Sequence, residues 1–437
     1  MRPWEKTTVS ETGNMMFGGC DTVKLARTYG TPLYVLDEQR VRSVCRGFFD
    51  TLKRCGAKGR VLYASKALCT TALYRIVMEE ELGADVVSGG ELYTALHAGF
   101  PAERIYLHGN NKTPEEIRMA LEAGVACLVI DSHEEIGLIA KIARELGKTA
   151  RVSLRTKPGI EAHTHEYIMT AREDCKFGLG LYDGEAEKAV REIVSHPELE
   201  LIGIHCHIGS QIFELEPFVI ATDRLTDFAV ELRDKFGVTI SEINFGGGYG
   251  ITYTDEDAAM EPYDYVEAMV KNLQAQCAAK GLPQLEFVIE PGRSIVGEAG
   301  LTLYTVGTVK HIPNVRTYVS VDGGMGDNPR QILYGSLYTA KLANKPNAPV
   351  KEAVTVAGRC CESGDVLIKE APLPACEAGD TLAVFSTGAY NYAMASNYNR
   401  VPIPAMVLVN NGQHGLIVRR QSYEQLIEND MVPQWVK

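Results

Sequence analysis

The sequence predicts an eight-stranded parallel β/α barrel followed by a β-rich domain. Between residues 60 and 290, β-rich runs alternate with helix-like segments, and the runs occupy 60–66, 84–88, 104–109, 127–132, 150–159, 201–210, 242–250 and 285–294. Most of these runs are continuously apolar, as expected for strands buried on both faces. Because crossover helices make successive strands parallel, the pattern predicts a TIM-type (β/α)8 barrel, with a doubly wound sheet as the alternative.

The segments between the runs have helical spacing. Residues 115–124, 134–147 and 217–237 place apolar side chains on one helix face, and each segment ends in a glycine that suits a helix C-cap. We therefore expect these three segments to be crossover helices.

Polar residues at the strand ends favour the barrel over the doubly wound sheet. They follow or end successive runs and are Lys66, Ser88, His108, Asp131, Arg155, His207, Gly246 to Gly248 and Glu290. Barrel enzymes place their active sites at this C-terminal face of the strands.

The secondary-structure pattern of the sequence changes near residue 300. Beyond it the chain is β-rich with little helix, which predicts an all-β sandwich or barrel. The segment TPLYVLD (31–37) is also β-like and precedes the barrel. We expect an N-terminal segment (1–36) that joins the β domain, a cofactor-binding barrel (37–296) and a C-terminal β domain (297–437).

Composition excludes several classes of function. The 437 residues include 56 acidic against 44 Lys plus Arg, a net charge of −12, which argues against binding to nucleic acid or an anionic membrane. No apolar run is long enough for a membrane span, and the N-terminus lacks the apolar core of a signal peptide. The eleven cysteines include no CxxC pair, which favours reduced thiols in the cytoplasm.

Two consecutive strand ends carry a phosphate-binding pattern. NFGGGYG (244–250) lets backbone amides approach an anion, although a tight turn is the alternative. EPGRS (290–294) follows the next strand, and barrels often bind phosphate with the loops after strands 7 and 8. The sequence therefore predicts a phosphate site here. HTHE (163–166) lacks the spacing of a zinc motif, so we expect no metal.

Lys66 and Glu290 add the chemistry of a cofactor. A lysine in a barrel mouth is poorly solvated and suits Schiff-base formation. An inward glutamate would keep the ring nitrogen of pyridoxal phosphate protonated, whereas the alternative for Glu290 is a salt bridge to Arg155 or Arg293.

Histidine and cysteine offer further candidates. His205 and His207 share one strand face, where they would form part of a metal site, stack on a flat cofactor or belong to the core. Cys360 and Cys361, in GRCCESGD, offer either a catalytic thiol or inert packing.

Eight motifs in order resemble the diaminopimelate decarboxylase family. They are LYASKA, GADVVSGGEL, HCHIGSQ, NFGGGYG, EPGR, NPRQILYG, CESGD and STGAY, and they span nearly the whole chain. This family of pyridoxal-phosphate enzymes has an alanine-racemase-like barrel and is related to ornithine and arginine decarboxylases. Leu68 departs from the pattern, since relatives often carry Asn there.

The resemblance implies roles for individual residues. Lys66 would bind the cofactor, His207 would stack on its ring and Glu290 would pair with the ring nitrogen. Cys361 would protonate the carbanion that is left when CO2 departs. These four are the catalytic residues that the resemblance implies. Asp85 and Arg155 would lie around the cofactor. Its phosphate would be bound by Ser210, Gly247, Gly248, Gly292 and Arg293, helped by the hydroxyl of Tyr390. The substrate would contact Arg293, Arg330, Tyr334, Glu362 and Tyr390. Cys361 and Glu362 would come from the partner subunit of a homodimer with shared active sites.

The implied function is the decarboxylation of meso-2,6-diaminopimelate to L-lysine and CO2, the last step of lysine biosynthesis. Arg293 and Arg330 would bind the second carboxylate of this substrate, a group that simple basic amino acids lack. The alternatives are a decarboxylase of lysine, ornithine or arginine, and a catalytically inactive relative. Lys66 and Cys361 are both present, which argues against an inactive relative.

Overall fold

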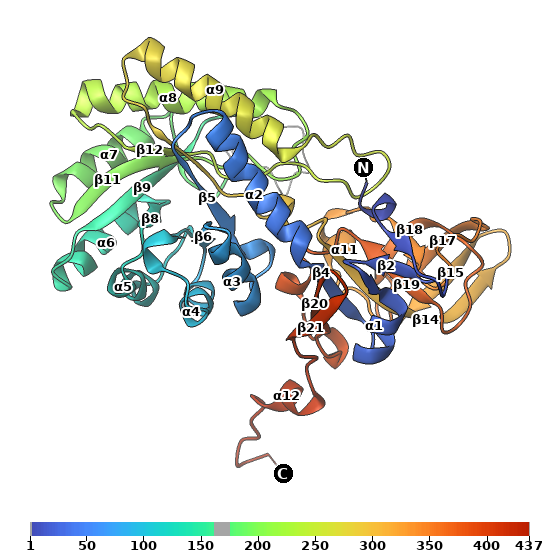
Figure 1. The fold of residues 1–437 in the computed structure, drawn as a ribbon. Coiled ribbons are helices and arrows are strands. Elements are labelled where there is room, and N and C mark those ends of the chain that lie inside the picture. The colour runs from blue at the N-terminus through green and yellow to red at the C-terminus, as the bar shows by residue number, and fades with distance from the viewer. Residues whose placement is uncertain (1, 161–174, 437) are drawn as a thin grey trace. The chain divides into compact units, whose positions relative to one another are not determined.

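The computed structural model describes residues 2–160 and 175–436, which fall into two compact units (Figure 1). The barrel unit comprises Arg42–Ile251 and Ala258–Ile295. The β unit comprises Met1–Val41, Thr252–Asp257 and Val296–Lys437.

The barrel unit contains the eight predicted parallel strands. Each pairs with its neighbour, and the last pairs with the first, so the sheet closes. In chain order the strands are β5 (Gly59–Ala64), β6 (Gly83–Val86), β7 (Ile105–Leu107), β8 (Cys127–Ile130), β9 (Ala150–Lys157), β11 (Leu199–His205), β12 (Glu242–Asn244) and β13 (Glu286–Ile289). The short strand β10 (Leu179–Gly180) adds to β9. The predicted (β/α)8 barrel is confirmed.

Helices precede, connect and follow these strands. They are α2 (Glu38–Arg54), α3 (Thr71–Glu79), α4 (Gly89–His97), α5 (Pro114–Ala123), α6 (His133–Glu145), α7 (Glu185–Ser195), α8 (Glu216–Phe236), α9 (Pro262–Lys280) and α10 (Arg293–Val296). Thr113 and Glu116 form a capping box at the start of α5. Gly124 ends it in the left-handed conformation, with φ 77°. The three segments predicted as helices are confirmed as α5, α6 and α8.

Large side chains fill the barrel interior. Leu62, Tyr106, Val129 and Val288 come from four different strands and belong to one buried cluster. A closed sheet with a packed interior holds its strand ends rigidly, so the side chains at the C-terminal face have fixed positions.

The β unit is built on a sheet with strand order β18-β17-β15-β14-β4-β20-β21, to which β19 and β16 are added beside β14. The strands are β4 (Leu33–Asp37), β14 (Gly300–Ile312), β15 (Arg316–Val321), β16 (Ala340–Leu342), β17 (Glu352–Ala357), β18 (Val366–Leu373), β19 (Thr381–Phe385), β20 (Ala405–Asn410) and β21 (Gln413–Val418). Strand β4 lies between β14 and β20, so the N-terminal segment joins this sheet as predicted.

Short elements complete the β unit. They are β1 (Thr8–Val9), β2 (Met15–Phe17), β3 (Cys20–Asp21), α1 (Thr22–Tyr29), α11 (Arg330–Tyr334) and α12 (Tyr423–Ile427). The core of the unit packs Met15 and Leu33 against Leu301, Phe385 and Val407. In the described part of the chain, no helix is both long enough and apolar enough to cross a bilayer.

Candidate active site

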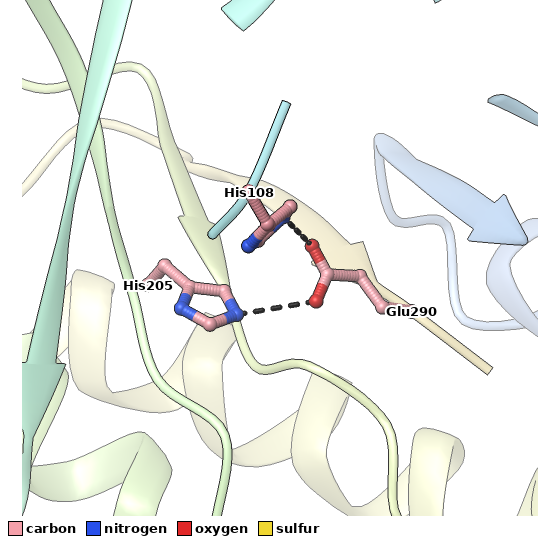
Figure 2. A group of neighbouring side chains, drawn as sticks. All are labelled: His108, His205 and Glu290. Carbon is pink, nitrogen blue, oxygen red and sulfur yellow. Dashed lines mark hydrogen bonds and ion pairs between the residues drawn. The ribbon is translucent and has the colours of Figure 1, made fainter. Parts of the chain in front are cut away.

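Glu290 is the centre of a buried polar cluster at the C-terminal face of the barrel. It follows β13 directly, and its Oε1 lies 2.7 Å from His108 Nε2. His205 Nε2 donates a hydrogen bond of 3.1 Å to Oε2 (Figure 2). The Asn244 amide donates to Oε1 at 2.7 Å. The alternative expected from the sequence, a salt bridge from Glu290 to Arg155 or Arg293, is wrong, because these neighbours are histidines.

The charges in this cluster are coupled. Burial alone would raise the pKa of Glu290, but the adjacent His108 and His205 hold it well below its usual range. Burial alone would lower the pKa of His108, but the charges of Asp85 and Glu290 raise it. Burial lowers the pKa of His205 to about 4. A proton on His108 and a negative charge on Glu290 therefore favour each other.

Asp85 and Arg155 lie beside this cluster. Asp85, in β6, places Oδ1 3.7 Å from His108 Nε2, and burial raises the pKa of its carboxyl. Arg155, in β9, pairs with Asp131 at 3.3 Å and lies 4.4 Å from the centre of the Phe177 ring. The strand ends thus hold acidic and basic groups close together with little water around them.

Lys66 follows β5 in a short 3-10 helix, Ser65–Ala67. The expectation that this lysine is poorly solvated is wrong, since its side chain is exposed. Burial lowers the pKa of the His207 ring well below its usual value, and the charges of Lys66 and Arg155 lower it further. The amide of Gly247 lies 3.4 Å from His207 Nδ1. Lys66, His207 and the glycine loop are therefore neighbours.

The glycines after β12 and β13 lie close to neighbouring backbone and side-chain atoms. Gly248 has φ 113°, and a Cβ there would lie 2.3 Å from the Gly209 carbonyl oxygen. A Cβ on Gly247 would lie 2.3 Å from the Glu290 carbonyl oxygen. One on Gly292 would lie 3.0 Å from Ala64 Cβ. A phosphate at these loops would therefore contact backbone amides rather than side chains.

Two side chains complete the phosphate-binding candidates of the barrel unit. Arg293 is buried and donates to Ser210 Oγ through Nη2 at 2.9 Å and through Nε at 3.3 Å. The predicted residues Ser210, Gly247, Gly248, Gly292 and Arg293 thus lie in neighbouring loops. Asn244 also belongs here, because its Oδ1 accepts from the Gly246 amide at 3.0 Å while its amide binds Glu290.

The β unit holds the second group of predicted residues. The Arg330 guanidinium is buried among three tyrosine rings, 5.9 Å from the ring centre of Tyr253, 5.4 Å from that of Tyr334 and 5.5 Å from that of Tyr390. Its Nη2 donates to Ser336 Oγ at 3.3 Å. Its Nε is buried and has no hydrogen-bond partner among the described residues. Such a donor suits an anionic ligand.

The loop between β17 and β18 carries the two adjacent cysteines. Cys361 is exposed, and its amide donates to Asn399 Oδ1 at 2.7 Å. Cys360 is partly buried, and burial raises the pKa of its thiol to about 11. The next residue, Glu362, accepts from the Gly364 amide at 3.1 Å. Cys361 is therefore the more accessible thiol of the pair.

The sequence reasoning identified most of these side chains but missed two. His108 was noted only as a polar strand end, and Asn244 was not noted, although both terminate barrel strands next to Glu290. Asn244 is the last residue of β12, so the pattern of polar strand ends that includes His108 also extends to it. The HTHE segment (163–166) lies outside the described residues.

The chain is similar to known pyridoxal-phosphate decarboxylases. A family model described as "Pyridoxal-dependent decarboxylase, pyridoxal binding domain" matches residues 40–297. The diaminopimelate decarboxylase of Bacillus methanolicus is 50% identical over 95% of this chain and 96% of its own length. The chain belongs to the diaminopimelate decarboxylase family. Bacillus subtilis (strain 168) has a further diaminopimelate decarboxylase, 48% identical over 96% of this chain and 95% of its own length.

Solved structures of diaminopimelate decarboxylases share this fold. The M. jannaschii enzyme is 36% identical, with a TM-score of 0.93 and full coverage of both chains. The Helicobacter pylori enzyme complexed with L-lysine is 33% identical, with a TM-score of 0.85 over 93% of this chain and 98% of that one.

The family's cofactor, pyridoxal phosphate, fits the residues of the barrel unit. A cradle of glycines whose backbone leaves no room for Cβ atoms suits its phosphate. Asp85 Oδ1 is buried and has no hydrogen-bond partner among the described residues, which suits a site that receives a polar group. Lys66 offers the exposed amine that the aldehyde requires.

Proposed function

We propose that the protein decarboxylates meso-2,6-diaminopimelate to L-lysine and CO2, the last step of lysine biosynthesis, with pyridoxal 5'-phosphate as cofactor. The observation that carries the proposal is the 50% identity with a diaminopimelate decarboxylase over 95% of the chain. The M. jannaschii and Helicobacter pylori enzymes, which are described in complex with L-lysine, support an amino-acid product of this kind.

In this proposal the barrel unit holds the cofactor. When bound, pyridoxal phosphate provides the electron sink for the bond pair left on the substrate's α-carbon as CO2 departs. Lys66 would bind it covalently, and His207 would stack on its ring. Arg293, Ser210 and the glycine loops bind its phosphate, helped by the Tyr390 hydroxyl. Glu290 holds a proton on the ring nitrogen, because a buried carboxylate stabilises the cationic form of its partner.

Substrate recognition is assigned to the β unit. Diaminopimelate carries a second carboxylate at its far end, and the Arg330 guanidinium has a buried Nε available for it. The ring centres of Tyr334 and Tyr390 lie 5.4 and 5.5 Å from that guanidinium and favour its positive charge. Glu362 would bind the distal amine, and Arg293 would assist with the carboxylate.

Cys361 is proposed to donate the proton that replaces CO2 on the α-carbon. Its exposure and its place in the β unit support a role toward a second copy of the chain, so we propose a homodimer with shared active sites. The functional domains would be the barrel (37–296) and the β domain (297–437), which the N-terminal segment (1–36) joins. All eleven cysteines are free thiols, which supports a reducing compartment and hence the cytoplasm.

A decarboxylase of another basic amino acid has weaker support. The lysine/ornithine decarboxylase from Vibrio vulnificus is only 19% identical, with a TM-score of 0.76, and it shows the fold alone.

The test is CO2 release from meso-, LL- and DD-diaminopimelate, lysine and ornithine, measured side by side. We expect meso-diaminopimelate to be the preferred substrate. Lys66→Ala should abolish turnover and the visible absorbance of lysine-bound cofactor, whereas Lys141→Ala, an exposed lysine on α6, should change neither. Faster release from lysine or ornithine would contradict the proposal.

A further inference from the structure

Four acidic and imidazole side chains form a buried row across the barrel mouth. Asp85, His108, Glu290 and His205 are 3%, 5%, 7% and 1% exposed, and they come from the ends of β6, β7, β13 and β11. Figure 2 shows the two imidazoles approaching the two oxygens of one carboxylate. The rings also pack edge to face, with centroids 4.9 Å apart. The contacts within this row determine which of the four side chains carries a proton.

The geometry of His205 indicates a neutral ring. Its Nε2 donates to Glu290 Oε2 at 3.1 Å, so this nitrogen carries a proton. Its Nδ1 is buried and has no hydrogen-bond partner among the described residues. A second proton there would be a buried donor without an acceptor, which is costly. Burial also lowers the pKa of His205 to about 4, in agreement with the geometry.

His108 differs because two carboxylates flank one of its nitrogens. Its Nε2 lies 2.7 Å from Glu290 Oε1 and 3.7 Å from Asp85 Oδ1. Opposite charges at these distances favour the imidazolium form, and the pKa of His108 is raised accordingly. The opposing charge is Arg155, which is itself paired with Asp131 at 3.3 Å.

We propose that His108 and His205 form an asymmetric clamp on Glu290, in which charged His108 keeps the carboxylate ionised and neutral His205 fixes its orientation. Both are positioning residues, since they act on the cofactor through Glu290. The inference rests on the proposed function, in which Glu290 pairs with the ring nitrogen.

The same three residues are also of the types that bind zinc. However, each imidazole nitrogen already contacts a different carboxylate oxygen directly, at 2.7 and 3.1 Å. The His108 contact is an ion pair, since its Nε2 has no hydrogen-bond partner among the described residues, and the His205 contact is a hydrogen bond. The contacts therefore favour a clamp over a metal site.

Other groups that face the clamp must be considered in any pH experiment. Lys66 and Arg155 favour the charged form of Asp85, whereas Arg155 opposes a proton on either histidine. His207 also lies within reach of the charge of Glu290. The proton on His108 thus depends chiefly on Asp85 and Glu290. These two are therefore the residues to substitute when the charge of His108 is tested.

The first experiment reads the proton positions in the cofactor-free protein. Nitrogen-15 NMR of histidine-labelled protein near pH 6, assigned with single variants, should show His108 as imidazolium and His205 as neutral with its proton on Nε2. Glu290→Gln should lower the charged fraction of His108, because the coupling is reciprocal. A charged His205, or a neutral His108, would overturn the clamp.

The second experiment exploits the difference between a charge and a donor. A glutamine amide can replace the Nε2–H donor of a neutral histidine but not the charge of an imidazolium. His205→Gln should therefore retain most of kcat. His108→Gln should raise the pKa of Glu290, because it removes the positive charge beside the carboxylate, and this adds an acidic limb to the pH profile of kcat.

His133→Gln is the matched control, because His133 pairs with Glu185 and Glu192 at 3.2 and 3.3 Å on the outer helices. It should leave kcat unchanged at every pH. Equal pH profiles for His108→Gln and His205→Gln would contradict the asymmetry. If His108→Gln does not fold, Asp85→Asn tests the same charge, since it should lower the charged fraction of His108.

The proposed decarboxylase function and the histidine clamp on Glu290 can be contradicted separately. If wild-type protein releases no CO2 from diaminopimelate, the proposed function is wrong, while the NMR experiment still decides the state of the clamp. The other case is a wild-type protein that is active. If His108→Gln then has the pH profile of the wild type, and the nitrogen-15 chemical shift of the cofactor's ring nitrogen is also unchanged, only the clamp is wrong.

Discussion

The Asp365 carboxylate accepts a hydrogen bond of 2.7 Å from the Cys360 amide, and through its other oxygen it binds a second loop. Oδ1 accepts from the Met325 amide at 2.6 Å. A Cβ on Gly324 or Gly358 would lie 2.5 or 2.2 Å from this carboxylate, so both loops approach it with backbone alone. Asp365 therefore joins the thiol loop to the segment that leads into α11.

Replacing Asp365 should loosen both loops. Asp365→Ala leaves two amides without an acceptor, and each loss costs on the order of 1–3 kcal/mol. We expect a lower melting temperature, faster hydrogen exchange at Met325 and Cys360, and a reduced kcat. Asp365→Asn, which retains one acceptor oxygen, should be less severe. Wild-type exchange rates in the alanine variant would show that the contacts are unimportant.

Arg330→Ala should impair recognition of the substrate more than binding of the cofactor. The loss of a charge-assisted hydrogen bond costs about 1.5–3 kcal/mol, which corresponds to a rise in KM of about 10- to 150-fold. Arg330→Lys keeps the charge but lacks the planar fork, so its KM should be intermediate. Steady-state kinetics with diaminopimelate and a cofactor titration measure the two effects separately. An unchanged KM in the alanine variant contradicts the assignment.

Gly247→Ala should weaken cofactor binding, because its Cβ would lie 2.3 Å from the Glu290 carbonyl oxygen. Overpacking of this kind costs about 1–3 kcal/mol and displaces the backbone of the phosphate loop. The control is Gly137→Ala in α6, where a Cβ meets nothing within 4 Å. Fluorescence titration with pyridoxal phosphate should separate them. Equal affinities would argue that this loop does not bind the phosphate.

The strands of the barrel could be predicted because each is a short apolar run followed by a polar residue. Strand β8 (Cys127–Ile130), for example, is buried throughout and is followed by Asp131. Burial on both faces leaves a signal that depends only on local sequence. That the N-terminal segment joins the β sheet was also predictable, since residues 31–37 are β-like and precede the first barrel strand, but its neighbours β14 and β20 were not.

The partners of individual charges were not predictable in this way. The alternative for Glu290 was a salt bridge to Arg155 or Arg293, yet it contacts His108 and His205, while Arg155 pairs with Asp131. Which side chains meet across a barrel depends on the tilt and stagger of its strands, and no local pattern encodes these. Solvation of Lys66 likewise depends on the exact end of β5.

Glu91 provides a pH dependence that stability measurements can test. Burial raises the pKa of its carboxyl to about 7, although the Val87 amide donates to it at 2.8 Å and favours its charge. Between its usual value of 4.5 and about 7, the folded chain binds a proton that the unfolded chain lacks. Stability from this group therefore falls as pH rises through that window.

Glu91→Gln should remove this pH dependence. Relative to wild type, the variant should gain about 2–3 kcal/mol between about pH 5 and pH 8. Urea unfolding at both pH values measures the difference, with Glu122→Gln, an exposed glutamate on α5, as the control. A constant difference across this range would mean that Glu91 does not titrate there.

The last prediction concerns where Cys361 acts. Lys66 belongs to the barrel unit and Cys361 to the β unit, and the proposed homodimer pairs Lys66 of one chain with Cys361 of the partner subunit. Lys66→Ala and Cys361→Ala should each be nearly inactive. Cys376→Ala, a cysteine elsewhere in the β unit, should be fully active. An active Cys361→Ala variant would show that this thiol is not the proton donor.

Mixing the two inactive variants under conditions that exchange subunits then distinguishes the two arrangements. Half of the dimers become mixed, and in each of them one site combines an intact Lys66 with an intact Cys361, while the other site carries both lesions. Activity should return to about a quarter of wild type, by counting on a symmetric dimer. If the thiol instead served its own chain, every site would keep one lesion and mixing would restore nothing.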